Sequence, residues 1–244
     1  MTCVVAVMPF DSYATYNPTS ANIIIPNIIR MKKIITLFLF LCAALIHIQA
    51  KDVVLGAEQT KQYLPLLKGK RVALLSNHTG IVIQGKDTIH TLDLLLQHGV
   101  EVTAIFSPEH GFRGTAREGE HVASSVDEKT GIPILSLYDG KSKRPSKEAM
   151  ATFDILITDI QDVGLRFYTY YVTMLRLMDV CAQEGKQFMV FDRPNPNGYY
   201  VDGPILDMKH KSGVGGLPIP VVHGMTLGEL AQMINGERWL SDSL

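Results

Sequence analysis

From residue 51 onward, short apolar runs rich in β-branched residues alternate with segments of helical periodicity. The apolar runs predict buried strands, at residues 71–75, 100–106, 132–137, 154–158 and 186–191. Apolar residues that recur every three or four positions predict helices, at residues 88–98, 168–184 and 226–235. This alternation predicts an α/β fold of the Rossmann-like kind, a mostly parallel sheet with helices on both faces.

Polar side chains follow four of the predicted strands. They lie at residues 76–78, 107–110, 159–162 and 192–195. In an open parallel sheet, ligands bind beyond the carboxyl ends of the strands. The pattern therefore predicts one site where these loops converge. Loops are also polar simply because water covers them, and that alternative stays open at this point.

The segment before residue 51 has the pattern of a secretory signal. Met31 is followed by Lys32 and Lys33, then by an apolar run to residue 46, and Ala50 ends an acceptable cleavage tripeptide. We expect residues 31–50 to be a signal peptide and the protein to be exported to the periplasm or another extracytoplasmic space. We expect residues 1–30 to be an unstructured extension upstream of the true start. An uncleaved anchor is less favoured, because the apolar run is short for a membrane span.

Charge and cysteine content exclude some classes of protein. The formal net charge of −1 over 244 residues gives no reason to expect nucleic acid or an anionic membrane as partner. Cys181 falls on the apolar stripe of a predicted helix, so we expect a buried thiol rather than a nucleophile.

The segment Ser107-Pro108-Glu109-His110-Gly111 is the sharpest motif in the chain. Pro108 fixes a turn directly after a buried strand, and Gly111 permits close approach of a ligand. An apolar strand end would partly desolvate Glu109 and raise its pKa toward the range of a general acid. An exposed glutamate without a role is the alternative.

A second group of residues lies at the entry to the strongest predicted helix, where Asp159, Asp162 and Arg166 fall within eight residues. Asp162 would cap the segment leading into the helix, or Arg166 would pair with either aspartate, if their roles are structural. If they are functional, an aspartate serves as a second carboxylate and Arg166 clamps an anionic group.

Two further motifs follow. Asp192 and Arg193 precede a proline-stiffened turn that contains Asn195. His223 lies just before a helix that Thr226 would cap, with a glutamate three residues later as its capping-box partner. A rigid turn without a ligand and a purely structural histidine remain open.

We expect no metal and no cofactor. The histidines and aspartates have no zinc-ligand spacing on a helix, and neither a nucleophile elbow nor a glycine-rich phosphate loop is present in the sequence.

The motifs occur in the same order as in one known family: residues 76–80, 107–111, 159–170, 192–196, 216–218 and 223–226. The chain resembles the exo-β-N-acetylmuramidase (NamZ) family, formerly a domain of unknown function, over residues 52–240. The resemblance implies a Rossmann-like catalytic domain, here residues 51–244, and a smaller C-terminal domain that is missing from this chain. It also implies release of N-acetylmuramic acid from the non-reducing end of peptidoglycan fragments, with muropeptides as partners.

Under that resemblance we assign Glu109 as general acid, His110 as its orienting neighbour, and Asp159 or Asp162 as the second group, which stabilises the sugar cation or orients the substrate's N-acetyl group. Arg166 and Arg193 are candidates to bind the lactyl carboxylate of muramic acid. The remaining substrate-binding candidates are Asn77, His78, Tyr168, Asn195 and His223. Alternatives are a non-catalytic muropeptide-binding module and a metal-dependent envelope hydrolase.

Overall fold

The computed structural model describes residues 30–38, 53–108, 112, 125–137 and 144–241. The chain divides into two units, residues 1–52 and 53–244. In the first unit, residues 30–38 form an exposed helix. Among the helices of the described ranges, none combines the length and the apolar character needed to cross a bilayer.

The second unit is built on a six-stranded sheet of order β5-β6-β4-β1-β7-β8. The strands are β1 (Arg71–Ser76), β4 (Glu101–Ser107), β5 (Ser125–Val126), β6 (Pro133–Ser136), β7 (Ile155–Asp159) and β8 (Gln187–Val190). All neighbours pair in parallel except β5, which is antiparallel to β6. The five parallel strands follow the order of doubly wound sheets, so the predicted α/β fold is confirmed.

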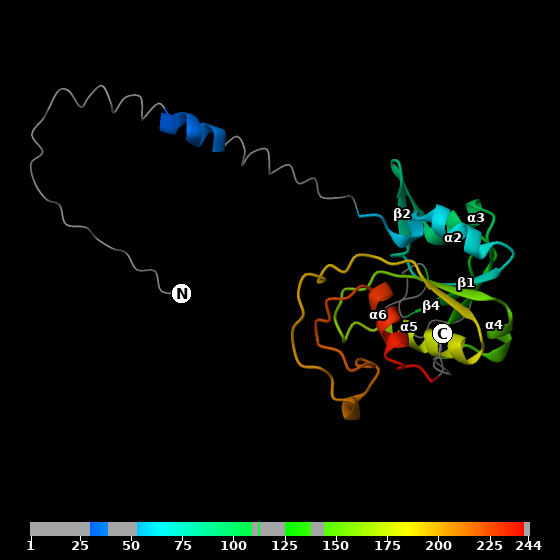
Figure 1. The fold of residues 1–244 in the computed structure, drawn as a ribbon. Coiled ribbons are helices and arrows are strands. Elements are labelled where there is room, and N and C mark those ends of the chain that lie inside the picture. The colour runs from blue at the N-terminus through cyan, green and yellow to red at the C-terminus, as the bar shows by residue number, and fades with distance from the viewer. Residues whose placement is uncertain (1–29, 39–52, 109–111, 113–124, 138–143, 242–244) are drawn as a thin grey trace, which may run out of the picture. The chain divides into compact units, whose positions relative to one another are not determined.

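Helices cover both faces of this sheet (Figure 1). The helices are α2 (Thr60–Leu67), α3 (Thr91–Gln97), α4 (Lys147–Ala151), α5 (Tyr170–Gln183) and α6 (Leu227–Gly236), with short 3-10 turns η2 (Gly56–Glu58) and η3 (Met208–His210). Side chains alternate across a strand. Accordingly, Val72 and Leu74 of β1 pack with α2 and α3, whereas Ala73 and Leu75 pack with α4, α5 and α6. Cys181 is buried in the cluster that contains Ala73 and Leu75, and burial raises the pKa of its thiol to about 12.

One predicted helix begins later than expected. Residues 88–90 belong to a hairpin of β2 (Ile81–Gln84) and β3 (Asp87–His90), and α3 starts only at Thr91. The turn is made by Gly85, whose φ of 63° suits a two-residue hairpin connection. The prediction failed because Ile89 fits the apolar stripe of the following helix as well as a strand, and only pairing with β2 decides between them.

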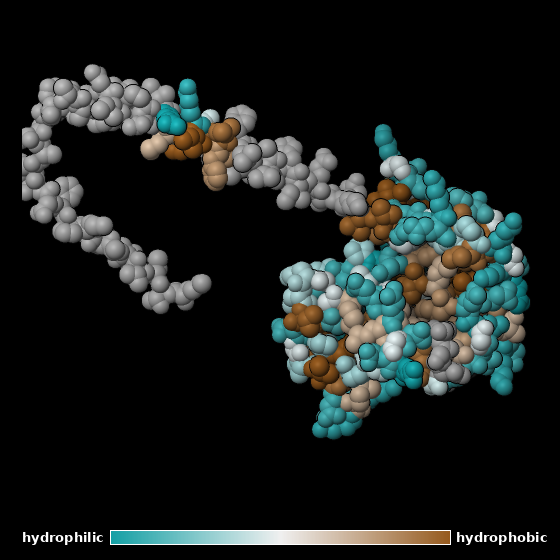
Figure 2. All heavy atoms as spheres, in the orientation of Figure 1, coloured by the Kyte–Doolittle hydropathy of each residue, from teal (hydrophilic) through white to brown (hydrophobic). Residues whose placement is uncertain are grey.

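The long connection between β8 and α6 carries an exposed apolar surface. Arg166 links two points within it, since Nη1 donates to the carbonyl oxygens of Pro204 and Ile219, both at 2.7 Å. Exposed apolar side chains lie along it, at Tyr199, Tyr200, Val201, Ile205, Met208 and Val214. Figure 2 shows hydrophobic residues in the region that Figure 1 colours orange.

Candidate active site

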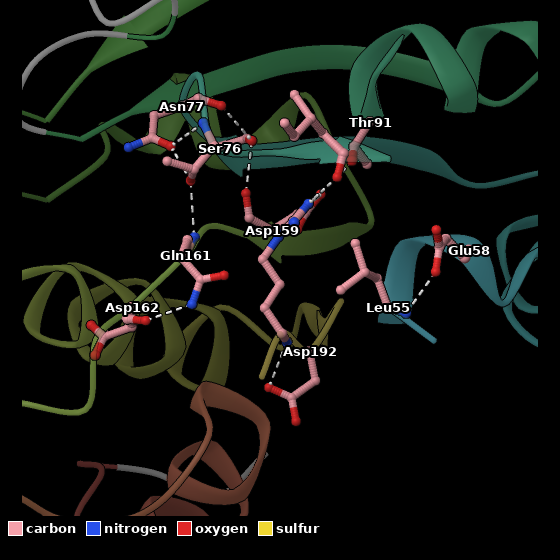
Figure 3. Close-up of polar contacts among 12 residues, drawn as sticks. Leu55, Glu58, Ser76, Asn77, Thr91, Asp159, Gln161, Asp162 and Asp192 are labelled. Atoms are coloured by element: carbon pink, nitrogen blue, oxygen red, sulfur yellow. Dashed lines mark hydrogen bonds and ion pairs between the residues drawn. The ribbon is translucent and has the colours of Figure 1, made fainter. Parts of the chain in front are cut away.

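The strand order of the sheet reverses between β1 and β7, and the loops that follow these two strands meet there. Ser76 Oγ donates to the carbonyl oxygen of Asp159 at 2.7 Å, and both residues are fully buried. Figure 3 shows Ser76, Asn77 and Asp159 side by side at the strand ends. A Cβ atom on Gly80 would lie 2.1 Å from Ser76 Oγ, so only glycine fits this close approach. This is the position at which doubly wound sheets bind ligands.

Asp159 and Arg193 form a buried ion pair in this crevice. Arg193 Nε donates to Asp159 Oδ1 at 2.6 Å, and Nη2 donates to Oδ2 at 3.1 Å. Thr91 Oγ1 donates to the same Oδ2, and Arg193 Nη2 also reaches the carbonyl oxygen of Ile81 at 3.0 Å. The carboxylate and the guanidinium therefore satisfy each other and join the ends of β7 and β8. A direct role of either on a substrate stays a prediction.

Asn77 organises the loop after β1. Its Nδ2 donates to Tyr170 Oη at 3.0 Å, at the start of α5, and its Oδ1 accepts from the amide of Thr79 at 2.9 Å. Thr79 Oγ1 in turn accepts from the amide of Gln161 at 2.9 Å. Asn77 is fully buried and is committed to these partners, whereas the neighbouring His78 is exposed.

The turn after β8 is held to helix α6. Asp192 Oδ2 accepts from Thr226 Oγ1 at 2.6 Å, and Oδ1 accepts from the amide of Gly228 at 2.8 Å. The predicted capping box of Thr226 and Glu229 is confirmed. Asn195 bridges within the same region, from Nδ2 to the carbonyl oxygen of Met225 at 2.9 Å.

Asp162 has one satisfied and one unsatisfied oxygen. Oδ1 accepts from the amide of Gly164 at 2.8 Å, which supports the predicted capping of the segment that leads to α5. Oδ2 is buried and has no hydrogen-bond partner among the described residues. Burial raises the pKa of Asp162 to about 6, against the lowering by nearby backbone amides. A carboxyl group with this pKa at the edge of the sheet is a candidate for proton transfer or for substrate contact.

His223 has the same character and lies close by. Its amide donates to the carbonyl oxygen of Gly164 at 3.2 Å, and its ring lies 6.5 Å from that of Tyr171. Nδ1 accepts from the amide of Met225 at 3.3 Å, so in the neutral ring Nε2 carries the proton. That Nε2 is buried and finds no partner in the part of the chain that the structure describes, and burial lowers the pKa of His223.

Asp162 is expected to make stability depend on pH. The pKa of Asp162 is about 6 in the folded protein and its ordinary value is 3.8. The contribution of the protonated carboxyl group to the free energy of unfolding is therefore fully present below pH 3.8 and is lost as pH rises through about 6. The difference corresponds to a loss of about 3 kcal/mol. Urea unfolding at about pH 4 and about pH 7, compared between the protein and Asp162→Asn, measures it. Equal pH dependence in the two proteins would contradict the assignment.

Two other predicted site residues, Arg166 and Tyr168, lie near the start of α5. Arg166 makes no ion pair with Asp159 or Asp162 in the described part of the chain, because its guanidinium binds backbone carbonyls. The predicted pairing of Arg166 with either aspartate was therefore wrong, and its role toward a substrate stays a prediction. Tyr168 is partly exposed, with its ring 5.0 Å from that of Tyr170.

Glu109 and His110 lie outside the described residues. Residues on both sides are described and buried: Ser107 ends β4, Pro108 follows it, and Phe112 is 3% exposed. The described residues that flank Glu109 and His110 are therefore buried, and Pro108 directly follows the carboxyl end of β4. Within the described ranges, no group of three histidines, cysteines or acidic residues is arranged to hold a metal ion.

His90 and Thr91 belong to this edge and were missed. Their polar side chains reach Asn77 and Asp159 because the hairpin β2–β3 returns the chain to the end of β1. A pair of candidate β-strands before the helix, with Gly85 between them, was the available signal.

A doubly wound domain that gathers carboxyl groups, an imidazole and amides beyond the carboxyl ends of its strands belongs to the class of open, mostly parallel α/β domains, which bind ligands at this edge when they bind them. Comparison with known families makes this class specific. The chain belongs to the family described as "Exo-beta-N-acetylmuramidase NamZ, N-terminal", whose model matches residues 72–244.

Relatives of known name or structure are similar over the same region. The peptidoglycan beta-N-acetylmuramidase NamZ of Bacillus subtilis is 49% identical over 177 residues, which cover 72% of this chain and 42% of that protein. Two crystal structures of DUF1343 family proteins from Bacteroides fragilis are 62% and 39% identical, with TM-scores of 0.68 and 0.70. Each covers 78% of this chain, which spans 49% and 47% of those chains. The chain thus spans about half the length of these relatives.

Proposed function

We propose that this chain is the catalytic part of an exo-β-N-acetylmuramidase, which removes N-acetylmuramic acid from the non-reducing end of peptidoglycan fragments. Membership of the family and 49% identity to a peptidoglycan β-N-acetylmuramidase support this proposal. The observation that carries it is the convergence of the segments after β1, β7 and β8 at one edge of the sheet.

Glycosidic cleavage needs an acid for the leaving oxygen and a group that stabilises or attacks the sugar cation. In our proposal Glu109 protonates the leaving oxygen, and His110 orients it. Asp162 is favoured over Asp159 as the second group. Oδ2 of Asp162 lacks a partner within the described ranges, whereas both oxygens of Asp159 are bonded by Arg193 and Thr91. Asp162 either faces the sugar cation or orients the N-acetyl group of the substrate.

The hydrogen bonds that Arg166 and Arg193 already make limit how they can bind a substrate carboxylate. A carboxylate such as the lactyl group of muramic acid is recognised by a guanidinium with free N–H groups. Nη1 of Arg166 and two nitrogens of Arg193 are bonded within the protein. We therefore propose that any contact of these arginines with the lactyl group uses their remaining N–H groups. We also propose that residues 31–50 direct export, so that the enzyme meets peptidoglycan fragments outside the cytoplasm.

Product analysis tests the proposed function. The chain is incubated with the disaccharide of N-acetylmuramic acid and N-acetylglucosamine, and the products are identified by mass spectrometry. The B. subtilis relative serves as positive control. Release of free N-acetylmuramic acid that persists with a chelator present supports the proposal. Binding without release, or loss of release with the chelator, would overturn it in favour of a binding module or a metal-dependent hydrolase, and a lack of both binding and release would also overturn it.

A further inference from the structure

We infer that His90 is a positioning residue of this site, which joins the loop after β1 to the residue that leaves the 107–111 motif. The inference rests on the proposed function for its catalytic consequence and on contacts in the structure for the placement. His90 is 7% exposed and does not belong to any of the motifs that suggested the function.

The hairpin brings His90 to the edge of the sheet. His90 pairs with Ile81 at the open end of β2–β3, and the next amide, that of Thr91, donates to the carbonyl oxygen of Gly80 at 2.8 Å. The chain therefore leaves β1, runs out along the hairpin and returns to within hydrogen-bonding distance of its starting point. A direct connection from β1 to α3 would not place a side chain there.

Both ring nitrogens of His90 are used. Nδ1 accepts from the amide of Leu92 at 3.1 Å, which caps α3. Since an accepting Nδ1 carries no proton, Nε2 carries it and donates to the carbonyl oxygen of Asn77 at 2.8 Å. These two contacts fix the plane of the ring and one end of the loop whose side chains engage Tyr170 and Gln161.

The same ring packs on Phe112. Their centroids are 4.8 Å apart at 71°, an edge-to-face contact. Phe112 belongs to the buried hydrophobic cluster that also contains residues of β4, β6 and α3, and it is the first described residue after the motif. His90 therefore contacts both the carbonyl oxygen of Asn77 and the ring of Phe112, the residue that follows the motif. A shift of the His90 ring would change both contacts.

Two substitutions separate this role from simple helix capping. His90→Asn places an acceptor where Nδ1 lies and keeps the cap on Leu92, but it reaches neither Asn77 nor Phe112. His90→Gln places its amide nitrogen near the position of Nε2 and keeps the bond to Asn77, while the cap is lost. His98→Asn, at the exposed end of the same helix, is the matched control.

We expect His90→Asn to lower kcat by on the order of 10-fold to 100-fold with KM nearly unchanged, because small misplacements of catalytic groups cost this much. His90→Gln should recover most of kcat while losing more thermal stability, and His98→Asn should change neither. Normal kcat in His90→Asn, or equal loss in both His90 variants, would overturn the inference.

Hydrogen exchange provides a readout that does not need activity. In His90→Asn, amides of residues 77–81 should exchange faster than in the wild type, since the carbonyl of Asn77 also accepts from the amide of Gly80 at 3.0 Å. Amides of α3 should keep their protection. Unchanged exchange at residues 77–81 would overturn the placement even if kcat falls. If the wild type releases no sugar, the proposed function fails, and exchange alone still decides whether His90 holds this loop.

Discussion

Replacing Glu109 with glutamine is expected to lower the release of N-acetylmuramic acid by about 10²-fold to 10⁴-fold, the usual contribution of a general acid. Glutamine has the same shape but holds no transferable proton, so the leaving oxygen must depart unprotonated. Binding of the disaccharide should change little, because the loss falls on the chemical step rather than on ground-state contacts. The measurement is kcat and KM on a chromogenic N-acetylmuramic acid glycoside.

A matched control lies on the same strand. Glu101 is exposed at the opposite, amino end of β4, so Glu101→Gln makes the same chemical change away from the site and should leave kcat unaltered. A chromogenic leaving group of low pKa needs less protonation, so the loss in Glu109→Gln should be smaller on that substrate than on the natural disaccharide. A folded Glu109→Gln protein with near-normal turnover on both substrates removes Glu109 from the mechanism.

Breaking the ion pair of Asp159 and Arg193 should produce the largest loss of stability. We expect Asp159→Ala to lower the free energy of unfolding by about 3–5 kcal/mol, the usual cost of stranding a buried charge. Asp159 is fully buried, and its removal leaves the 7%-exposed side chain of Arg193 without its counter-charge. Urea unfolding monitored by circular dichroism measures the change.

A double-mutant cycle tests the cause. If the cost arises from the stranded guanidinium, Asp159→Ala combined with Arg193→Ala should cost less than the sum of the two single changes. Lys129→Ala is the control, because its ion pair with Asp93 is exposed at the lysine and such pairs are worth at most about 1 kcal/mol. Additive losses, or a loss at Asp159 no larger than that at Lys129, would show that the pair is not coupled as the geometry implies.

Much of the fold was predictable because buried strands have a strong local signal. Residues 72–75 and 155–157 are wholly apolar, and they lie in the interior of the sheet, where both faces are covered. Helix α6 was predictable from its capping box and apolar stripe. The hairpin that contains Ile89 was not, because its two strands are short, largely exposed and pair only with each other.

The site was predictable in outline. The rule that loops meet at the carboxyl edge correctly grouped Asn77, Asp159 and Arg193. It did not predict that Asp159 and Arg193 bind each other, nor that Arg166 holds backbone carbonyls of the long connection. Which polar atoms stay unsatisfied, such as Oδ2 of Asp162, depends on every neighbour at once.

By itself, the sequence determined the alternation of strands and helices, the edge at which polar loops gather and the family. These follow from side-chain periodicity and from local motifs, and both depend only on residues that are close together in the sequence. Only the tertiary structure decided the partners: Arg193 with Asp159, 34 residues away, and His90 with Asn77 across a hairpin. Such pairs depend on strand order, register and burial, and periodicity along the chain does not encode the distance between two loops that folding brings together.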